Sequence, residues 1–206
     1  MTTATQTAIE AVVLEAADPV AAEAFYEAAF GLGDRVRVRP ASDEPSSGFR
    51  SFTLSLVVAQ PSVVDSYINS AKAAGATVLK DPKKSMWGYG GVVQAPDGAI
   101  WKVATSAKKD SGPAVRTVDE IVLLLGAADV KASKSFYTDH GLTVDKSFGG
   151  KYVQFAASGA IKLALYGHKA LAKDAGVAPE GSGAHRLAIL AGGTAPFTDP
   201  DGFTWE

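Results

Sequence analysis

The sequence predicts an α+β fold made of two tandem copies of one unit, because two motifs recur in the same order. The first motif is an Asp followed seven residues later by Phe-Tyr, and it begins at Asp18 and again at Asp129. The second is a Pro-Asp-Gly turn followed by Trp, centred on Asp97 and again on Asp201. A duplicated unit with unequal insertions explains both pairs.

The two predicted copies span residues 7–105 and 116–206. Residues 106–115 are predicted to link them, because this stretch is small, charged and rich in Gly and Pro, as linkers are. The second half of the second copy is abbreviated, since Gly192-Gly193-Thr194 stands where a helix would be expected.

Each copy is predicted to open with a strand and a helix. Short apolar runs at residues 11–16 and 120–125 predict buried strands. Asp18 and Asp129 are expected to cap the helices that follow, and glycine ends each helix. Alternation over residues 35–39 places arginines on one face of a strand and valines on the other.

The remaining elements are predicted from apolar runs between turn signals. In the first copy we expect a helix over residues 61–74. Further strands are predicted at residues 52–58, 77–80, 92–94, 100–104, 143–147, 151–156, 161–166 and 185–190. A short helical stretch over residues 169–175 follows His168, which is expected in an exposed loop.

Composition excludes several classes of protein. A hydrophobic share of 47% and a charged share of 20% are typical of a globular chain with a core. The formal net charge of −2 provides no basic field for nucleic acid or membrane. No signal peptide or membrane-spanning run is predicted, so a cytoplasmic location is expected. Because the chain has no cysteine, only His, Asp and Glu could hold a metal ion.

The recurring motifs resemble the vicinal oxygen chelate superfamily, which includes glyoxalase, bleomycin-resistance and dioxygenase-like proteins. The resemblance rests on the Asp-to-Phe-Tyr helices, on Trp87-Gly88 ahead of Pro96-Asp97-Gly98, and on Asp199-Pro200-Asp201-Gly202. It covers nearly the whole chain, thinly at residues 40–48 and 167–183. It implies paired βαβββ modules that form two cupped, mostly antiparallel sheets around a small-molecule site.

The resemblance also implies positions for metal ligands, and most of them hold unsuitable residues here. The matching positions are Ala11, Val122, Ser51 and Lys102, none of which is a usual ligand of a divalent ion. In the second copy His185 begins a strand that resembles a ligand-bearing one, and Glu206 lies in the ligand register. No metal is therefore expected, and His185 and Glu206 remain the candidates if a divalent ion does bind.

Aromatic residues are the predicted ligand-binding side chains, since Tyr and Trp combine an apolar ring with a polar tip. Ordinary core packing is the alternative for each of them. The residues predicted to bind a ligand are Trp87, Tyr89, Trp101, Tyr152, Tyr166 and Trp205.

Two functions are consistent with these residues. The first is a metal-independent protein that binds a small aromatic or antibiotic-like molecule in a cupped sheet. The alternative is a divalent-metal-dependent lyase, isomerase or dioxygenase acting near His185 and Glu206, with His185 as the candidate catalytic residue. A homodimer is an open alternative to a single chain, and the fold alone does not choose between these functions.

Overall fold

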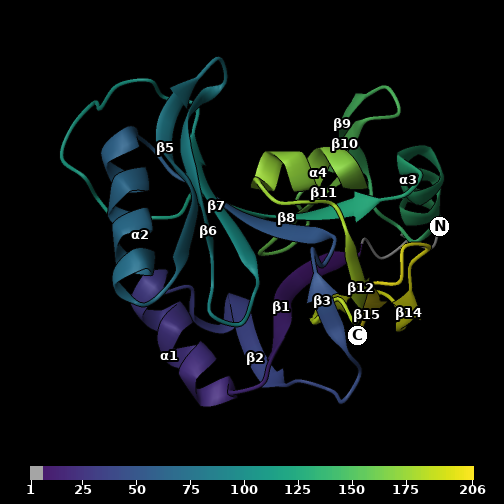
Figure 1. Ribbon diagram of the computed structural model, residues 1–206. Coiled ribbons are helices and arrows are strands. Elements are labelled where there is room, and N and C mark those ends of the chain that lie inside the picture. Colours follow the sequence, from purple (N-terminus) through teal and green to yellow (C-terminus); the bar gives the residue numbers. More distant parts are fainter. Residues whose placement is uncertain (1–6) are drawn as a thin grey trace.

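The computed structural model describes residues 7–206, whose strands form two sheets and one short ribbon (Figure 1). In spatial order the eight-stranded sheet consists of β5 (Thr77–Ser85), β6 (Gly88–Gln94), β7 (Ile100–Thr105), β4 (Phe52–Val57), β8 (Glu120–Ala127), β11 (Lys162–Gly167), β10 (Tyr152–Phe155) and β9 (Val144–Phe148). The five-stranded sheet consists of β14 (Phe197–Thr198), β15 (Thr204–Trp205), β13 (Leu187–Gly192), β1 (Ala8–Ala16) and β2 (Val36–Pro40). The ribbon pairs β3 (Ser46–Gly48) with β12 (Gly181–Gly183).

Four α-helices accompany these sheets, and the predicted α+β class is confirmed. They are α1 (Pro19–Ala29), α2 (Pro61–Ala73), α3 (Val130–Asp139) and α4 (His168–Ala175), and a short 3-10 turn, η1 (Gly33–Arg35), precedes β2. The predicted caps of α1 and α3 are confirmed, because the Asp18 and Asp129 carboxylates accept backbone N–H bonds from the first helical turns. Among residues 7–206, no helix is long and apolar enough to cross a membrane.

Each sheet combines strands from both predicted copies. Strand β4 pairs antiparallel with β8, which joins the two halves of the eight-stranded sheet, and β1 pairs antiparallel with β13 in the five-stranded sheet. Figure 1 shows blue-teal and green strands in the larger sheet and purple and yellow strands in the smaller. The sequence repeat and the sheets therefore divide the chain in different ways.

The larger sheet buries one face of its central strands. Helix α2 packs against β6 and β7, and α3 packs against β10 and β11. Alternate residues of the central strands, including Leu54, Trp101 and Leu123, are fully buried on this face. Burial of such side chains stabilises the fold by roughly 1.5–3 kcal/mol each. The opposite face is covered only in part, by α4.

The segment predicted to be a linker is anchored to the start of α2. The Asp110 carboxylate accepts a 2.8 Å hydrogen bond from the Ser62 backbone N–H. The Gln60 side-chain amide donates to the carbonyl oxygens of Gly112 and Pro113 and accepts from the Ser111 backbone. Gln60 makes no side-chain cap of its own to the helix, so Asp110 satisfies one of the free N–H groups at the helix start.

Two predicted segments differ in the structure. The strand expected at residues 185–190 begins at Leu187, because Arg186 has a φ of 59° that breaks the extended backbone. His168 is the first residue of α4 rather than part of an exposed loop, and it is half-buried. After β2, which is the edge strand of the five-stranded sheet, the chain forms the short strand β3 and pairs it with β12.

A tyrosine from each Phe-Tyr helix forms a hydrogen bond to an aspartate in or beside a Pro-Asp-Gly turn. Tyr26 donates a 2.6 Å hydrogen bond to Asp97, and Tyr137 donates to Asp199, which lies two residues before Asp201. The Asp199 carboxylate also accepts from the backbone N–H groups of Asp201 and Phe203. Burial raises the pKa of Asp199 above its usual range, against the lowering effect of these hydrogen bonds.

This shift predicts how the Asp199→Asn substitution will behave. Because the folded-state pKa of Asp199 is raised, ionisation of this carboxyl weakens the fold as pH rises above about 4. The variant should therefore be more stable relative to the wild type at pH 7 than at pH 4. Urea unfolding of both proteins at the two pH values measures this, and a difference that is independent of pH would contradict it.

Candidate functional site

The partly covered face of the eight-stranded sheet forms a cavity of about 710 Å³. Alternate residues of four neighbouring strands form its floor, since their partners in the sequence point into the core. These floor residues are Ser55 and Val57 of β4, Lys102 and Ala104 of β7, Glu120, Val122 and Leu124 of β8, and Tyr166 of β11. We call this cavity the cup.

Aromatic rings form one wall of the cup. Tyr152 and Tyr166 lie on paired strands and contact edge to face, with ring centroids 5.8 Å apart. Phe148 lies 6.0 Å from Tyr152 and is 66% exposed. Burial raises the pKa of Tyr152 above its usual range, so its hydroxyl is neutral at physiological pH and donates to Gln154. This wall presents flat apolar surface with few polar groups.

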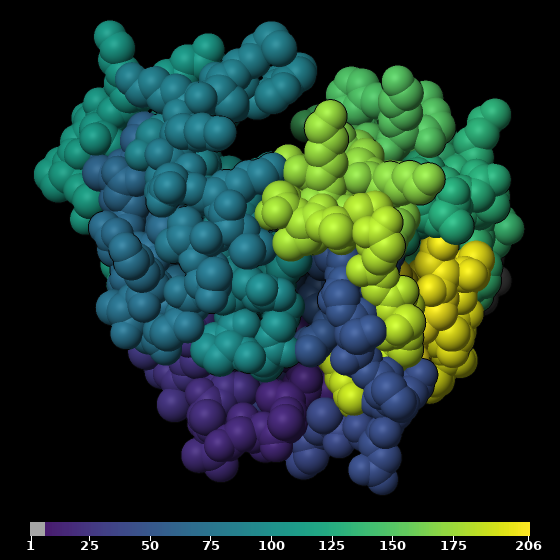
Figure 2. Space-filling model, in the orientation of Figure 1, coloured from purple at the N-terminus to yellow at the C-terminus, as the bar shows by residue number. Residues whose placement is uncertain are grey.

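Trp87 stands on another side of the cup, at the tip of the β5–β6 hairpin. Its side chain is 83% exposed although it lines the cavity. The Ser85 hydroxyl accepts its backbone N–H, which fixes the turn. Gly88 follows with a φ of 135°, and a side chain there would meet the Thr105 carbonyl. In the orientation of Figure 2 a hollow separates this hairpin from the green segments of the second copy.

Helix α4 closes part of the cup. Leu171, Ala172 and Ala175 are buried against Phe49 and other apolar residues of the sheet face. The helix starts at His168, whose Nδ1 lies 2.7 Å from the Ser51 hydroxyl and whose Nε2 lies 2.7 Å from the Pro179 carbonyl oxygen. The helix is thus held to the sheet at its first turn as well as along its apolar face.

The middle of the floor does not fit a metal ion. Lys102, Ser55, Val122 and Lys162 occupy one row across four adjacent strands, as the pairing register shows. Two ammonium groups, a hydroxyl and an aliphatic side chain supply no carboxylate or imidazole, which divalent ions require in proteins. Glu120 lies beside this row and is engaged by Lys162. Across residues 7–206, no group of three or more His, Asp or Glu side chains is placed to hold a metal ion.

Ser51, which the resemblance places at a ligand position, lies outside this row. It precedes β4, has a φ of 62°, and donates its hydroxyl to the Gly126 carbonyl oxygen. The residue in register with Lys102 and Val122 is Ser55. The difference of four residues arises because the chain turns at Ser51 before the strand begins.

His185 and Glu206, the predicted metal and catalytic candidates, are both engaged by other groups at the five-stranded sheet. The two ring nitrogens of His185 lie 2.8 Å from the Arg50 carbonyl oxygen and 3.1 Å from that of Asp201. The Glu206 carboxylate accepts both of its hydrogen bonds from Arg39, which also contacts Glu15. Both side chains are thus held by other groups of the protein.

The structure brings together three of the six aromatic residues that the sequence singled out. Trp87, Tyr152 and Tyr166 all line the cup. Tyr89 lies in an adjoining hollow, and burial together with its hydrogen bond to Asp65 raises its pKa to about 12. Trp101 and Trp205 lie elsewhere.

Trp101 and Trp205 are fully buried in the main core. Trp101 packs 4.6 Å from Phe30, and Trp205 stacks 5.1 Å from Phe197. Trp101 lies on the face of β7 opposite to Lys102, and Trp205 lies on β15 of the five-stranded sheet; both positions indicate core packing rather than ligand contact.

Asp174 is a cup residue that the sequence did not single out. It is the seventh residue of α4, and its carboxylate lies 2.8 Å from the Lys102 ammonium. The helical spacing of Leu171, Ala172 and Ala175 could have indicated which face of α4 is buried. It could not have indicated that the helix lies in the cup.

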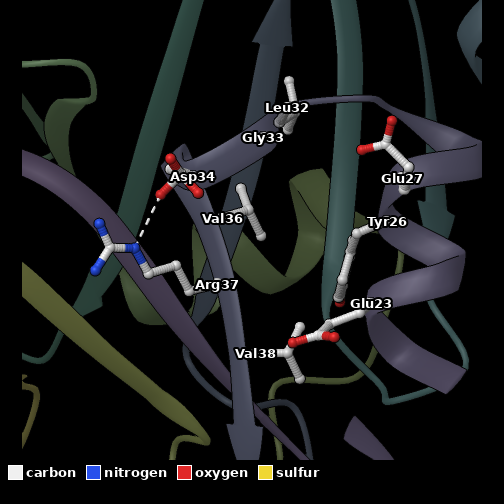
Figure 3. A pocket seen from close by; sticks show the side chains of 9 residues that line it. All are labelled: Glu23, Tyr26, Glu27, Leu32, Gly33, Asp34, Val36, Arg37 and Val38. Atoms are coloured by element: carbon white, nitrogen blue, oxygen red, sulfur yellow. Dashed lines mark hydrogen bonds between the residues drawn. The ribbon is translucent and has the colours of Figure 1, made fainter. Parts of the chain in front are cut away.

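A second hollow, of about 430 Å³, lies between α1 and β2 (Figure 3). Glu23 and Glu27 of α1 border it on one side, and the Arg37 side chain points away toward the Asp34 carbonyl oxygen. Strand β2 is the edge strand of its sheet. The hollow's one aromatic ring, Tyr26, already donates its hydroxyl to Asp97, so the cup is the better candidate site.

Comparisons with known proteins identify the fold. Glyoxalase I from Zea mays is 14% identical in sequence, with a TM-score of 0.61 over 97% of this chain and 91% of that one. A Bacillus subtilis protein described as a candidate dioxygenase is 12% identical, with a TM-score of 0.58 over 91% of this chain and 71% of that one. Neither a protein-family profile nor a curated protein sequence matches the chain.

These likenesses confirm the predicted glyoxalase-type fold over almost the full length of the chain. At these sequence identities they show the fold alone, and a shared fold does not carry a shared reaction. The function must therefore be argued from the side chains of the cup.

Proposed function

We propose that this protein binds a planar aromatic small molecule in the cup and needs no metal ion to do so. The observation that carries the proposal is the placement of Trp87 and of the aromatic wall, Phe148, Tyr152 and Tyr166, around one cavity. Two of these large apolar side chains are mostly exposed, which is unfavourable unless a partner covers them.

The size of the cup supports a small ligand. Its volume of about 710 Å³ lies within the range of roughly 300–1,000 Å³ that is typical of small-molecule sites. Stacked or edge-to-face contacts with aromatic rings add about 0.5–1.5 kcal/mol each beyond the area they bury. A flat ligand of two fused rings could contact the wall while Trp87 covers part of it.

The charges of the residues in the cup floor support binding without a metal ion. Lys102 and Lys162 lie in the row where the resemblance would place ligands, and an ion there would be repelled by their charges. Binding is thus expected to persist in the presence of a chelator.

Isothermal titration with 2-naphthamide, a neutral planar probe, tests the proposal. We expect a micromolar dissociation constant that EDTA does not change. Trp87→Ala and Phe148→Ala should each weaken binding by about tenfold, or about 1.4 kcal/mol, as truncation of an aromatic contact residue does.

Met86→Ala is the matched control. Met86 is the neighbour of Trp87 in the same turn and is 78% exposed, but it does not line the cup. Its replacement should leave the affinity unchanged. Absence of binding to the wild type, or equal losses in the Met86 and Trp87 variants, would refute binding in the cup.

A further inference from the structure

Lys102 lies on β7, at the side of the cup floor next to the adjoining hollow, and its only hydrogen-bonding partner among residues 7–206 is Asp174. The ammonium lies 2.8 Å and 3.1 Å from the two carboxylate oxygens. Both side chains are partly exposed, 34% for Lys102 and 39% for Asp174. Ion pairs with this exposure contribute little to stability, so another anion could replace the carboxylate at small cost.

Asp174 occupies an unfavourable place for a carboxylate. It lies in the last turn of α4, where the carbonyl groups carry partial negative charge. The Lys80 ammonium donates to the carbonyl oxygens of Lys173 and Asp174 at this end. Lys80 therefore offsets the partial charge of the helix end, and among the described residues only Lys102 forms hydrogen bonds with the carboxylate itself.

The charges around the cup leave an excess of cations. Lys80, Lys83 and Lys102 line the cup or the hollow that adjoins it, and Asp174 and Glu120 are the acids beside them. Glu120 is already paired with Lys162, which lies in the same floor row. Once Lys162 is included, and Asp145, which accepts from the cup-lining Gln154, four lysines face three carboxylates across the cup and the adjoining hollow, and this excess of positive charge favours an anionic ligand.

We infer that the ligand is an aromatic carboxylate, whose carboxylate binds Lys102 in place of Asp174 while its ring contacts the aromatic wall. This inference rests on the proposed binding of an aromatic molecule and adds the charge of the ligand. Lys102, Asp174, Tyr152 and Tyr166 all line the same cavity, so the proposed contacts with the cation and with the rings fall within one site. Asp174 then acts as an internal competitor that occupies Lys102 in the free protein.

Titration with 2-naphthoate and 2-naphthamide isolates the charge, because the two probes share a ring system and differ in the anionic group. The wild type should bind the carboxylate at least tenfold more tightly than the amide. Lys102→Met should remove this preference and leave amide affinity within twofold. Asp174→Asn should strengthen carboxylate binding by about three- to tenfold and leave amide binding unchanged, because the competitor has lost its charge.

Lys83→Met is the control, since it removes the same charge from the hollow beside the cup, where Lys83 forms no salt bridge with any residue of the range 7–206. This substitution should reduce carboxylate affinity by no more than about twofold. In the wild type, added salt should reduce the preference for the carboxylate over the amide. Thermal melts confirm that each variant is folded. The Asp174 variant gives an independent answer if the Lys102 variant does not fold.

The outcomes separate the two proposals. If the amide binds and the carboxylate binds no better, the inference fails and aromatic binding stands. If the preference survives Lys102→Met, or Asp174→Asn does not raise carboxylate affinity, the assigned roles of these two residues fail. If neither probe binds the wild type, both proposals fail.

Discussion

Replacing Trp205 with alanine should lower the free energy of unfolding by about 3–5 kcal/mol, as loss of a large core aromatic does. Trp205 is fully buried near the end of the chain, and its ring lies 5.4 Å from Tyr137 and stacks on Phe197. Alanine would leave a cavity in the layer between α3 and the five-stranded sheet. Urea unfolding followed by circular dichroism measures the change.

Trp87→Ala is the control for this loss. Because its side chain is 83% exposed, the free energy of unfolding should change by no more than about 0.5 kcal/mol. The two variants should thus behave oppositely in the stability and binding assays, since Trp205 is buried in the core and Trp87 is proposed to contact the ligand. Similar stability losses in both variants would show that the burial described for Trp205 is not present in solution.

Tyr137→Phe should lower the free energy of unfolding by about 1–3 kcal/mol or more, which is the second large effect that we expect. The substitution keeps the ring and removes the hydroxyl that donates to Asp199, whose residue is only 6% exposed. The carboxylate would then be left buried without one of its donors. Thermal and urea unfolding should both show the loss, and it should grow with pH as the unpaired carboxyl ionises.

Tyr26→Phe provides the matched comparison. Tyr26 makes the equivalent hydrogen bond to Asp97, which is half-buried and can be hydrated when the hydroxyl is removed. Tyr26→Phe should therefore lower the free energy of unfolding by less than Tyr137→Phe does. A larger loss from the Tyr26 variant would contradict the assigned role of burial.

Much of the fold could be predicted from local signals. The caps Asp18 and Asp129, the Pro-Asp-Gly turns and the alternating apolar runs all mark structures that neighbouring residues determine. The pairing of β4 with β8 could not be predicted in this way, because it depends on contacts between segments far apart in the sequence. The position of β13 was mistaken because the positive φ of Arg186 has no signature in a single sequence.

The site was predictable to a smaller extent. Trp87, Tyr152 and Tyr166 were identified as aromatic residues suited to a ligand, but composition alone does not separate them from Trp101 and Trp205. Strand alternation separates them only when the strand's register and its covered face are known. The ligand roles of these residues and the association of two chains stay predictions.

The exchange of strands between the sheets has a consequence for any break in the chain between the two repeats. Proteolysis within residues 106–115 would yield two fragments, each carrying part of both sheets rather than one intact domain. The nicked pieces would stay interlocked like the subunits of a dimer, and each piece alone would expose unpaired strand edges prone to aggregation. Co-expression, rather than separate production, is thus the route by which split halves of this protein would reassemble.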